Sequence, residues 1–138
     1  MLKLIRANRE RGTSTLEFAA VLPMLCLILV TIIELSRAWF TLNLVTSAAR
    51  EGVRAAAVAA PASASSVGSA RIDEVLQAAG MSCAPGTCTV TCNPSPCALD
   101  SQVTANVTVP FETIVPAFLP SMRSVNVVQM ARMRYEGP

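Results

Sequence analysis

Histidine is absent from this 138-residue chain, and charged and aromatic residues are scarce, at 14% and 4%. Without histidine, neither a Ser-His-Asp nor a Cys-His catalytic arrangement can form, and the imidazole ligands of most catalytic zinc sites are missing. The nine acidic residues are scattered, so they offer little for a site built on paired carboxylates. These absences argue against an enzyme and indicate no cofactor and no catalytic metal.

Positive charge is concentrated in residues 1–12, which contain four basic residues and one acidic residue. The rest of the chain carries seven basic and eight acidic residues, so it lacks the basic surface expected of a nucleic-acid-binding protein. A short basic leader of this kind instead suits the cytoplasmic side of a membrane.

Apolar residues are in excess, at 52% of the chain. Residues 18–33 read FAAVLPMLCLILVTII without a charge, between Glu17 and Glu34. With its flanks, to about residue 36, this run can cross the roughly 30 Å hydrocarbon core of a bilayer. The preceding basic residues predict a cytoplasmic N-terminus and a C-terminal part on the far side. Removal as an ordinary secretory signal is the alternative, although the following ELSRAWF is a poor cleavage site.

The helical pattern continues beyond the apolar run and predicts one helix over residues 13–60. Pro61 supplies a stop, and Pro23 is either a tolerated bend or a point where the helix loosens on packing into a filament. Small residues lie on one helix face, where they would pack against the chain's own distal domain or against a neighbouring subunit: Ala48, Ala49, Gly52 and Ala56.

Residues 61–138 are expected to form a small domain beyond the membrane. After a loop over 61–70, Ser69 would cap a helix over 70–79 that Gly80 closes. Alternation of period two predicts strands over 87–92, over 102–109 with Pro110 as the end, and over 125–134. The fold class is therefore α+β, a long N-terminal membrane-spanning helix with a small antiparallel sheet packed on its distal half. The apolar segment 111–120 would cover the sheet or contact a neighbour.

Four cysteines fall within fifteen positions, at Cys83, Cys88, Cys92 and Cys97. Beyond a membrane segment, such a cluster indicates disulfides, with zinc binding as the rival interpretation. An extended strand would hold Cys88 and Cys92 about 13 Å apart, which is too far for a bridge. We therefore favour Cys83–Cys88 and Cys92–Cys97, each closing a turn. The fifth cysteine, Cys26, is expected to be an inert side chain of the apolar run.

The run RGTSTLEFAAVLPMLCLILVTIIELSRAWF and the later motif AAREGVRAA resemble the TadE-like proteins of the tight-adherence (Flp) type IV pilus system. The resemblance covers about residues 11–60, and ARMRYE at 131–136 is also reminiscent of that family. The cysteine cluster departs from the pattern, so the distal domain would have features of its own.

This resemblance implies a minor pilin or pseudopilin that acts in pilus assembly, adhesion or secretion. A prepilin peptidase would cut after Gly12, which makes Thr13 the first residue and Glu17 the fifth. Other pilin subunits and inner-membrane assembly proteins would be partners. The protein would reside in the inner membrane, and incorporation into an extracellular pilus is a further expectation.

The charged residues that flank the apolar run also have an expected chemistry. A carboxylate at the edge of hydrocarbon is costly unless it is paired. Cleavage would create an ammonium group at Thr13, one helical turn from Glu17, which could neutralise the amine of its own chain or of a neighbour. The alternative places Glu17 among lipid headgroups. Glu34 and Arg37, three residues apart, are expected to pair at the far membrane surface.

A membrane-anchored binding module that keeps its leader is the second hypothesis, and an anchored enzyme is the least favoured. The N-terminal residue of the protein from cells separates the first two. Thr13 supports the pilin route, and Met1 supports a permanent tether.

Overall fold

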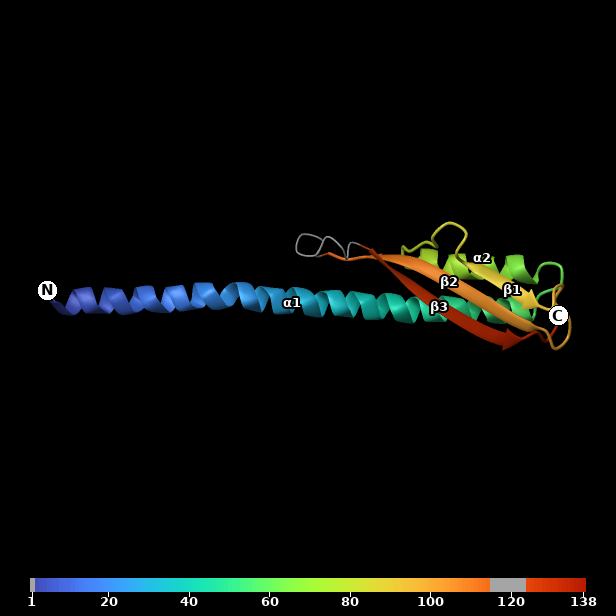
Figure 1. The fold of residues 1–138 in the computed structure, drawn as a ribbon, viewed down its shortest axis with the longest axis horizontal. Coiled ribbons are helices and arrows are strands. Elements are labelled where there is room, and N and C mark those ends of the chain that lie inside the picture. Colours follow the sequence, from blue (N-terminus) through green and yellow to red (C-terminus); the bar gives the residue numbers. More distant parts are fainter. Residues whose placement is uncertain (1, 115–123) are drawn as a thin grey trace. The chain divides into compact units, whose positions relative to one another are not determined.

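The computed structural model describes residues 2–114 and 124–138, with side chains from residue 14 onward. It divides into two compact units, Met1–Arg37 and Ala38–Pro138. The elements, labelled in Figure 1, are α1 (Leu2–Ala57), α2 (Ala64–Ala78), β1 (Thr89–Asn93), β2 (Gln102–Glu112) and β3 (Ser124–Arg134).

Helix α1 differs from its expected bounds at both ends. It begins at Leu2 rather than near Thr13, because the leader consists mainly of good helix formers. It ends at Ala57, whose carbonyl accepts the N–H groups of Glu136 and Gly137 at 3.0 and 3.1 Å. The C-terminal segment thus supplies hydrogen-bond donors to the last carbonyl of α1, and the helix ends before Pro61.

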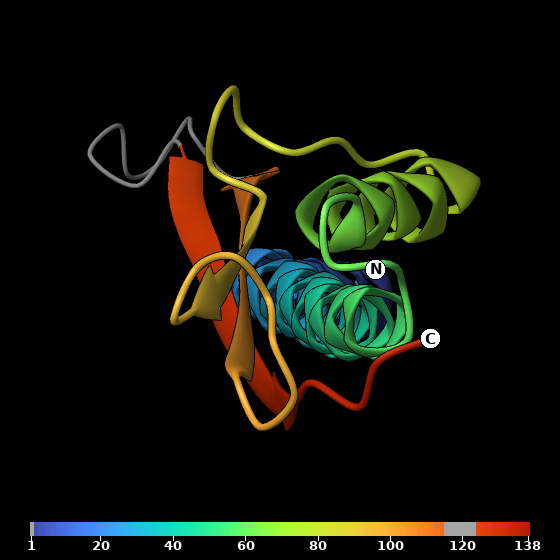
Figure 2. The same ribbon diagram turned by 90° about the vertical axis from the view of Figure 1, so that its right-hand side faces the viewer.

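The unit Ala38–Pro138 consists of a helix pair and a sheet. Figure 2 shows α1 and α2 side by side, with the sheet covering both. The core between the two layers combines fully or almost fully buried apolar residues from α1, α2, β1 and β2, among them Val45, Val53, Ile72, Leu76, Val90, Val103 and Val107, whereas β3 adds only partly buried residues such as Val127 and Ala131. This architecture confirms the predicted α+β class with an antiparallel sheet packed on the distal half of the long helix.

The sheet has the order β1-β2-β3, and both pairings are antiparallel. In β2 every second residue is buried, as the alternation predicts: Val103, Ala105, Val107, Val109 and Phe111. The expectation that Pro110 ends β2 is wrong, since the strand continues to Glu112. Strand β1 reaches only as far as Asn106 along β2, so Pro110 lies where β2 has one neighbour and its missing N–H leaves no ladder bond unmade.

Helix α2 begins six residues earlier than expected, at Ala64 with Ser63 as its N-cap, so much of the expected loop is helical. The residues buried on its inner face are spaced four apart: Ala64, Gly68, Ile72 and Leu76. The hydroxyls of Ser66 and Ser69 donate to carbonyls of the preceding turn, which makes serine compatible with this helix.

The ends of two other expected segments also differ from the prediction. Gly80, with φ +71°, follows α2 as expected, whereas the helix ends at Ala78 with Ala79 as its C-cap. In the apolar segment 111–120, Phe111 is buried in β2 and Ile114 is exposed. Residues 115–120 lie outside the described residues.

Candidate functional site: the apolar helix, the helix-pair contact and the disulfide loops

Among the described residues, α1 is long and apolar enough to cross a membrane, with a mean hydropathy of 2.5 over its most apolar 18 residues. None of those side chains is buried, and Met24 and Phe18 are 67% and 65% exposed. A continuous exposed apolar surface of this size marks a site of contact with a membrane or with another protein. The helix is therefore consistent with a single membrane anchor.

The polar groups of this part of α1 differ in how they are satisfied. The Thr31 and Ser36 hydroxyls donate to the carbonyls of Leu27 and Ile32, at 2.8 and 2.9 Å, so they need no outside partner. Glu17 is exposed at the start of the apolar run, and no described side chain pairs with it. Its carboxylate is the one charged group between residues 14 and 33, where it would need a counter-charge in lipid.

The other end of the run carries the expected ion pair. Nη1 of Arg37 lies 3.1 Å from Oε2 of Glu34, and the Glu34 side chain is the more protected of the two, at 17% against 43% exposure. Such a pair contributes a few tenths of a kcal/mol, so it orients the two side chains more than it stabilises the helix.

The small residues of α1 pack inside their own domain. Ala48, Ala49 and Ala56 are 0–1% exposed. A Cβ on Gly52 would lie 2.4 Å from Cγ1 of Ile72, and one on Gly68 would lie 2.9 Å from the Gly52 carbonyl oxygen. Both glycines are needed for this close approach of α1 and α2, so intramolecular packing accounts for the small-residue face.

An ion-pair cluster lies beside this helix contact. On α2, Nη1 of Arg71 lies 2.8 Å from Oε2 of Glu74. Its Nη2 lies 3.7 Å from Oε2 of Glu51 on α1. The hydrogen bond to Glu74, the charge of Glu74 and the weaker attraction of Glu51 together raise the pKa of Arg71. The guanidinium thus links α2 to α1 through Glu51.

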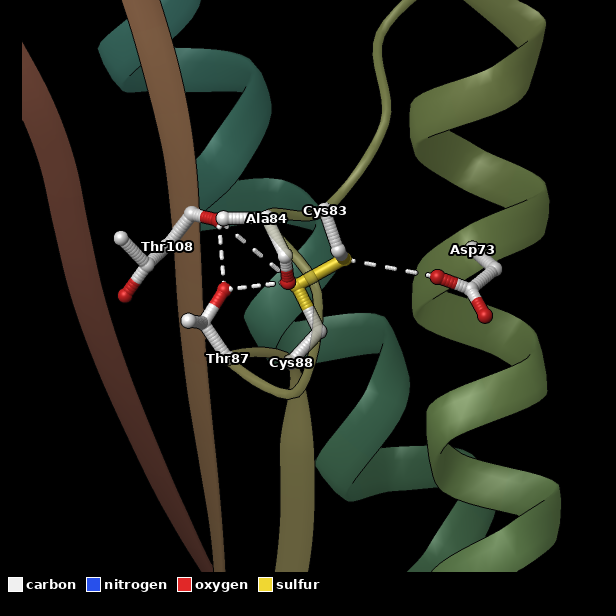
Figure 3. Close-up of a disulfide and its surroundings, with 6 residues drawn as sticks. All are labelled: Asp73, Cys83, Ala84, Thr87, Cys88 and Thr108. Atoms are coloured by element: carbon white, nitrogen blue, oxygen red, sulfur yellow. Dashed lines mark hydrogen bonds between the residues drawn. A yellow bond between two sulfur atoms is a disulfide. The ribbon is translucent and has the colours of Figure 1, made fainter.

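Figure 3 shows the first disulfide loop, in which Cys83 is bonded to Cys88 with a Cα–Cα distance of 5.8 Å. The Ala84 N–H donates to the Thr108 carbonyl at 3.3 Å, and the Thr87 hydroxyl approaches the same oxygen at 3.1 Å. Sγ of Cys83 lies 3.4 Å from Oδ1 of Asp73 on α2. The loop is thus hydrogen-bonded to β2 and lies in contact with α2.

The second disulfide joins Cys92 to Cys97 with a Cα–Cα distance of 5.3 Å, so both pairings agree with the arrangement favoured by the spacing. Cys97 is 5% exposed and belongs to the core. A sulfur held in a disulfide is not a thiolate ligand, which favours disulfides over the zinc interpretation. Cys26 is free and exposed in the apolar run.

The segment after β3 makes contacts that sequence reasoning missed. The hydroxyl of Tyr135, a residue that is 2% exposed, donates to the Ala59 carbonyl at 2.6 Å. With the bonds to Ala57, it fastens the end of the sheet to the end of α1. One long-range hydrogen bond leaves no periodic pattern in a sequence, so the only available signal was the single tyrosine itself.

These features define a class of protein, a single apolar N-terminal helix whose distal half forms the core of a small disulfide-containing α+β domain. The family model of TadE-like protein matches residues 12–54, so the chain carries a TadE-like domain at these positions. That family is associated with components of the Tad pilus and is typically non-enzymatic. No curated protein and no solved structure matches the chain.

Proposed function

We propose that this chain is a minor pilin or pseudopilin of a tight-adherence (Tad/Flp) type IV pilus, acting in pilus assembly, adhesion or secretion. The observation that carries the proposal is the TadE-like match, which starts at Gly12 and runs through the apolar helix to Arg54. Its partners would be other pilin or pseudopilin subunits, inner-membrane assembly proteins and a prepilin peptidase.

The first step of the proposed route is removal of residues 1–12. Cleavage after Gly12 exposes an ammonium group at Thr13, and the Glu17 carboxylate follows one helical turn later. A cation near this carboxylate lowers the cost of placing it at the edge of hydrocarbon. The N-terminal amine of a neighbouring subunit could supply this cation instead. The Glu17 carboxylate would then also guide assembly.

The topology in this proposal places the leader in the cytoplasm, α1 across the inner membrane and residues 61–138 outside the cytoplasm. The basic leader supports the orientation because basic flanks stay on the cytoplasmic side. The two disulfides support it independently, since such bonds persist in oxidising compartments.

The test is the N-terminal sequence and intact mass of the protein extracted from cells in detergent. The expected N-terminus is Thr13 in the wild type and Met1 in Gly12→Val, because a β-branched side chain would clash in a peptidase pocket shaped for glycine. The matched control is Asn8→Val, which places the same side chain elsewhere in the leader and should be processed normally.

An intact Met1 in the wild type would reject processing and favour a permanently anchored binding module. A Gly12→Val variant whose N-terminus is still Thr13 would show that cleavage does not depend on this glycine.

A further inference from the structure

A groove of about 480 Å³ lies between α1 and the edge strand β3, within the unit Ala38–Pro138. Figures 1 and 2 both show β3 running beside the distal part of α1. Helix α1 contributes Thr46, Ala49, Arg50, Val53 and Arg54. Strand β3 contributes five consecutive residues, 129–133. Side chains of a strand alternate between faces, so five consecutive residues line one groove only if the backbone edge itself lies open to it.

The register shows which backbone groups face this groove. The Tyr135 N–H donates to the Ser101 carbonyl at 2.8 Å, so these residues form a hydrogen-bonded pair. Such pairs alternate with non-hydrogen-bonded pairs along antiparallel strands, and the register is unbroken from Gln102↔Arg134 to Glu112↔Ser124. The even-numbered residues of β3 therefore direct their N–H and C=O groups away from β2.

An independent contact on the other side of β2 agrees with this assignment. The Ala84 N–H donates to the Thr108 carbonyl, which places an even-numbered residue of β2 toward the β1 side and away from β3. Thr108 is paired with Val128, so this pair is non-hydrogen-bonded, as the alternation requires. Met130 and Arg132 thus present main-chain donors and acceptors to the groove, where no other described residue bonds to them.

The charged residues that line the groove are all basic. Its lining includes Arg50, Arg54 and Arg132 and no acidic residue. None of these arginines forms an ion pair with a residue whose side chain the structure describes, in contrast to Arg134, which pairs with Asp100. The floor between them is apolar, since Ala49 and Val53 are 1% and 4% exposed.

We propose that an extended, acidic segment of a partner protein binds in this groove by adding a strand to the free edge of β3. Its main chain would pair with Met130 and Arg132, and its carboxylates would meet the three arginines. A second copy pairing through its own β3 is disfavoured, because that strand carries Arg132 and Arg134 and no acidic residue. The proposal does not depend on the pilus assignment.

The test uses the full chain in zwitterionic detergent micelles. The probe is a labelled peptide in which glutamate alternates with threonine, about seven residues long, which spans the groove at about 3.4 Å per residue. A peptide with lysine in place of glutamate is the matched probe. Binding is measured by fluorescence anisotropy, and amide exchange of β3 is followed residue by residue.

The expected result is binding of the glutamate peptide only, with slower exchange at Met130 and Arg132. At a peptide concentration 100 times the Kd, exchange at these two amides should slow by about 100-fold. The amides of Ala131 and Met133 already bond to β2 and should change far less.

Two substitutions distinguish the contribution of main-chain pairing to peptide binding from the contribution of charge. Met130→Pro removes a free-edge N–H, which an edge strand tolerates, and should weaken binding by about tenfold. Arg132→Gln should weaken it by about two- to fivefold, whereas Arg71→Gln, a matched charge change outside the groove, should have no effect.

Three outcomes would overturn the proposal. The first is no binding of the glutamate peptide. The second is binding without protection of Met130 and Arg132, which would indicate attraction to a charged surface alone, such as anionic lipids also provide. The third is protection of these amides in the peptide-free protein together with a dimeric mass, which would assign the edge to a second copy.

Discussion

Replacing Gly52 by alanine tests the close contact between α1 and α2. The added Cβ would lie 2.4 and 2.7 Å from Cγ1 and Cδ1 of the fully buried Ile72, and 3.1 Å from the Gly68 carbonyl oxygen. Overpacking of this kind costs about 1–3 kcal/mol, and the better helix propensity of alanine returns about 1 kcal/mol. We therefore expect Gly52→Ala to destabilise the distal domain by up to about 2 kcal/mol.

The assay is thermal or urea unfolding of the full chain in detergent, followed by near-UV circular dichroism. Tyr135 is the single tyrosine and is 2% exposed, so its signal reports the packing of the distal domain. For a domain of this size the expected decrease in Tm is about 4–8 °C per kcal/mol.

A double-mutant cycle with Ile72→Ala supplies the control, because that substitution removes the two Ile72 atoms that the new Cβ would meet most closely. The double variant should be more stable than the sum of the two single effects predicts, by about 1 kcal/mol. An increase in stability with Gly52→Ala, or strict additivity in the cycle, would refute the contact as the reason for glycine.

Three further substitutions test other features of the molecule. Tyr135→Phe removes the hydrogen bond to Ala59 and should lower the free energy of unfolding by about 1 kcal/mol, measured against wild type by far-UV circular dichroism because this variant lacks the tyrosine signal; an unchanged stability would show that this bond does not fasten the tail. Replacing Cys83 and Cys88 together by alanine opens a short loop and should cost about 2 kcal/mol, whereas Cys26→Ala should leave unfolding unchanged. Glu17→Ala should allow cleavage after Gly12 yet reduce the amount of the chain recovered with pili, and wild-type recovery would remove the proposed role of this carboxylate.

The features that the sequence predicts well are those with a repeating pattern. The uncharged run over 18–33, the small-residue face of α1 and the alternation in β2 each repeat at the period of their own element. The disulfide pairing followed from the reach of a strand, which is a local property. These parts could be predicted because neighbouring residues in the sequence carry the information.

The parts that were missed depend on contacts between distant residues. Residues 64–69 have the composition of a loop, and they become helical where Gly68 meets Gly52 of another helix. The bond from Tyr135 to Ala59 spans 76 positions and has no local signature. The groove beside β3 depends on strand order, since only the order makes β3 an edge.

The position of Tyr135 has a consequence for biosynthesis. The ribosome completes the second half of α1 early, yet the strands that cover it and the residue that fastens them follow up to 76 positions later. Closure over such a separation is slow compared with helix formation. While the chain is being synthesised, the face that carries Ala48 and Val53 therefore lacks its full cover until the last strand arrives, and a chaperone has that interval in which to hold the nascent chain.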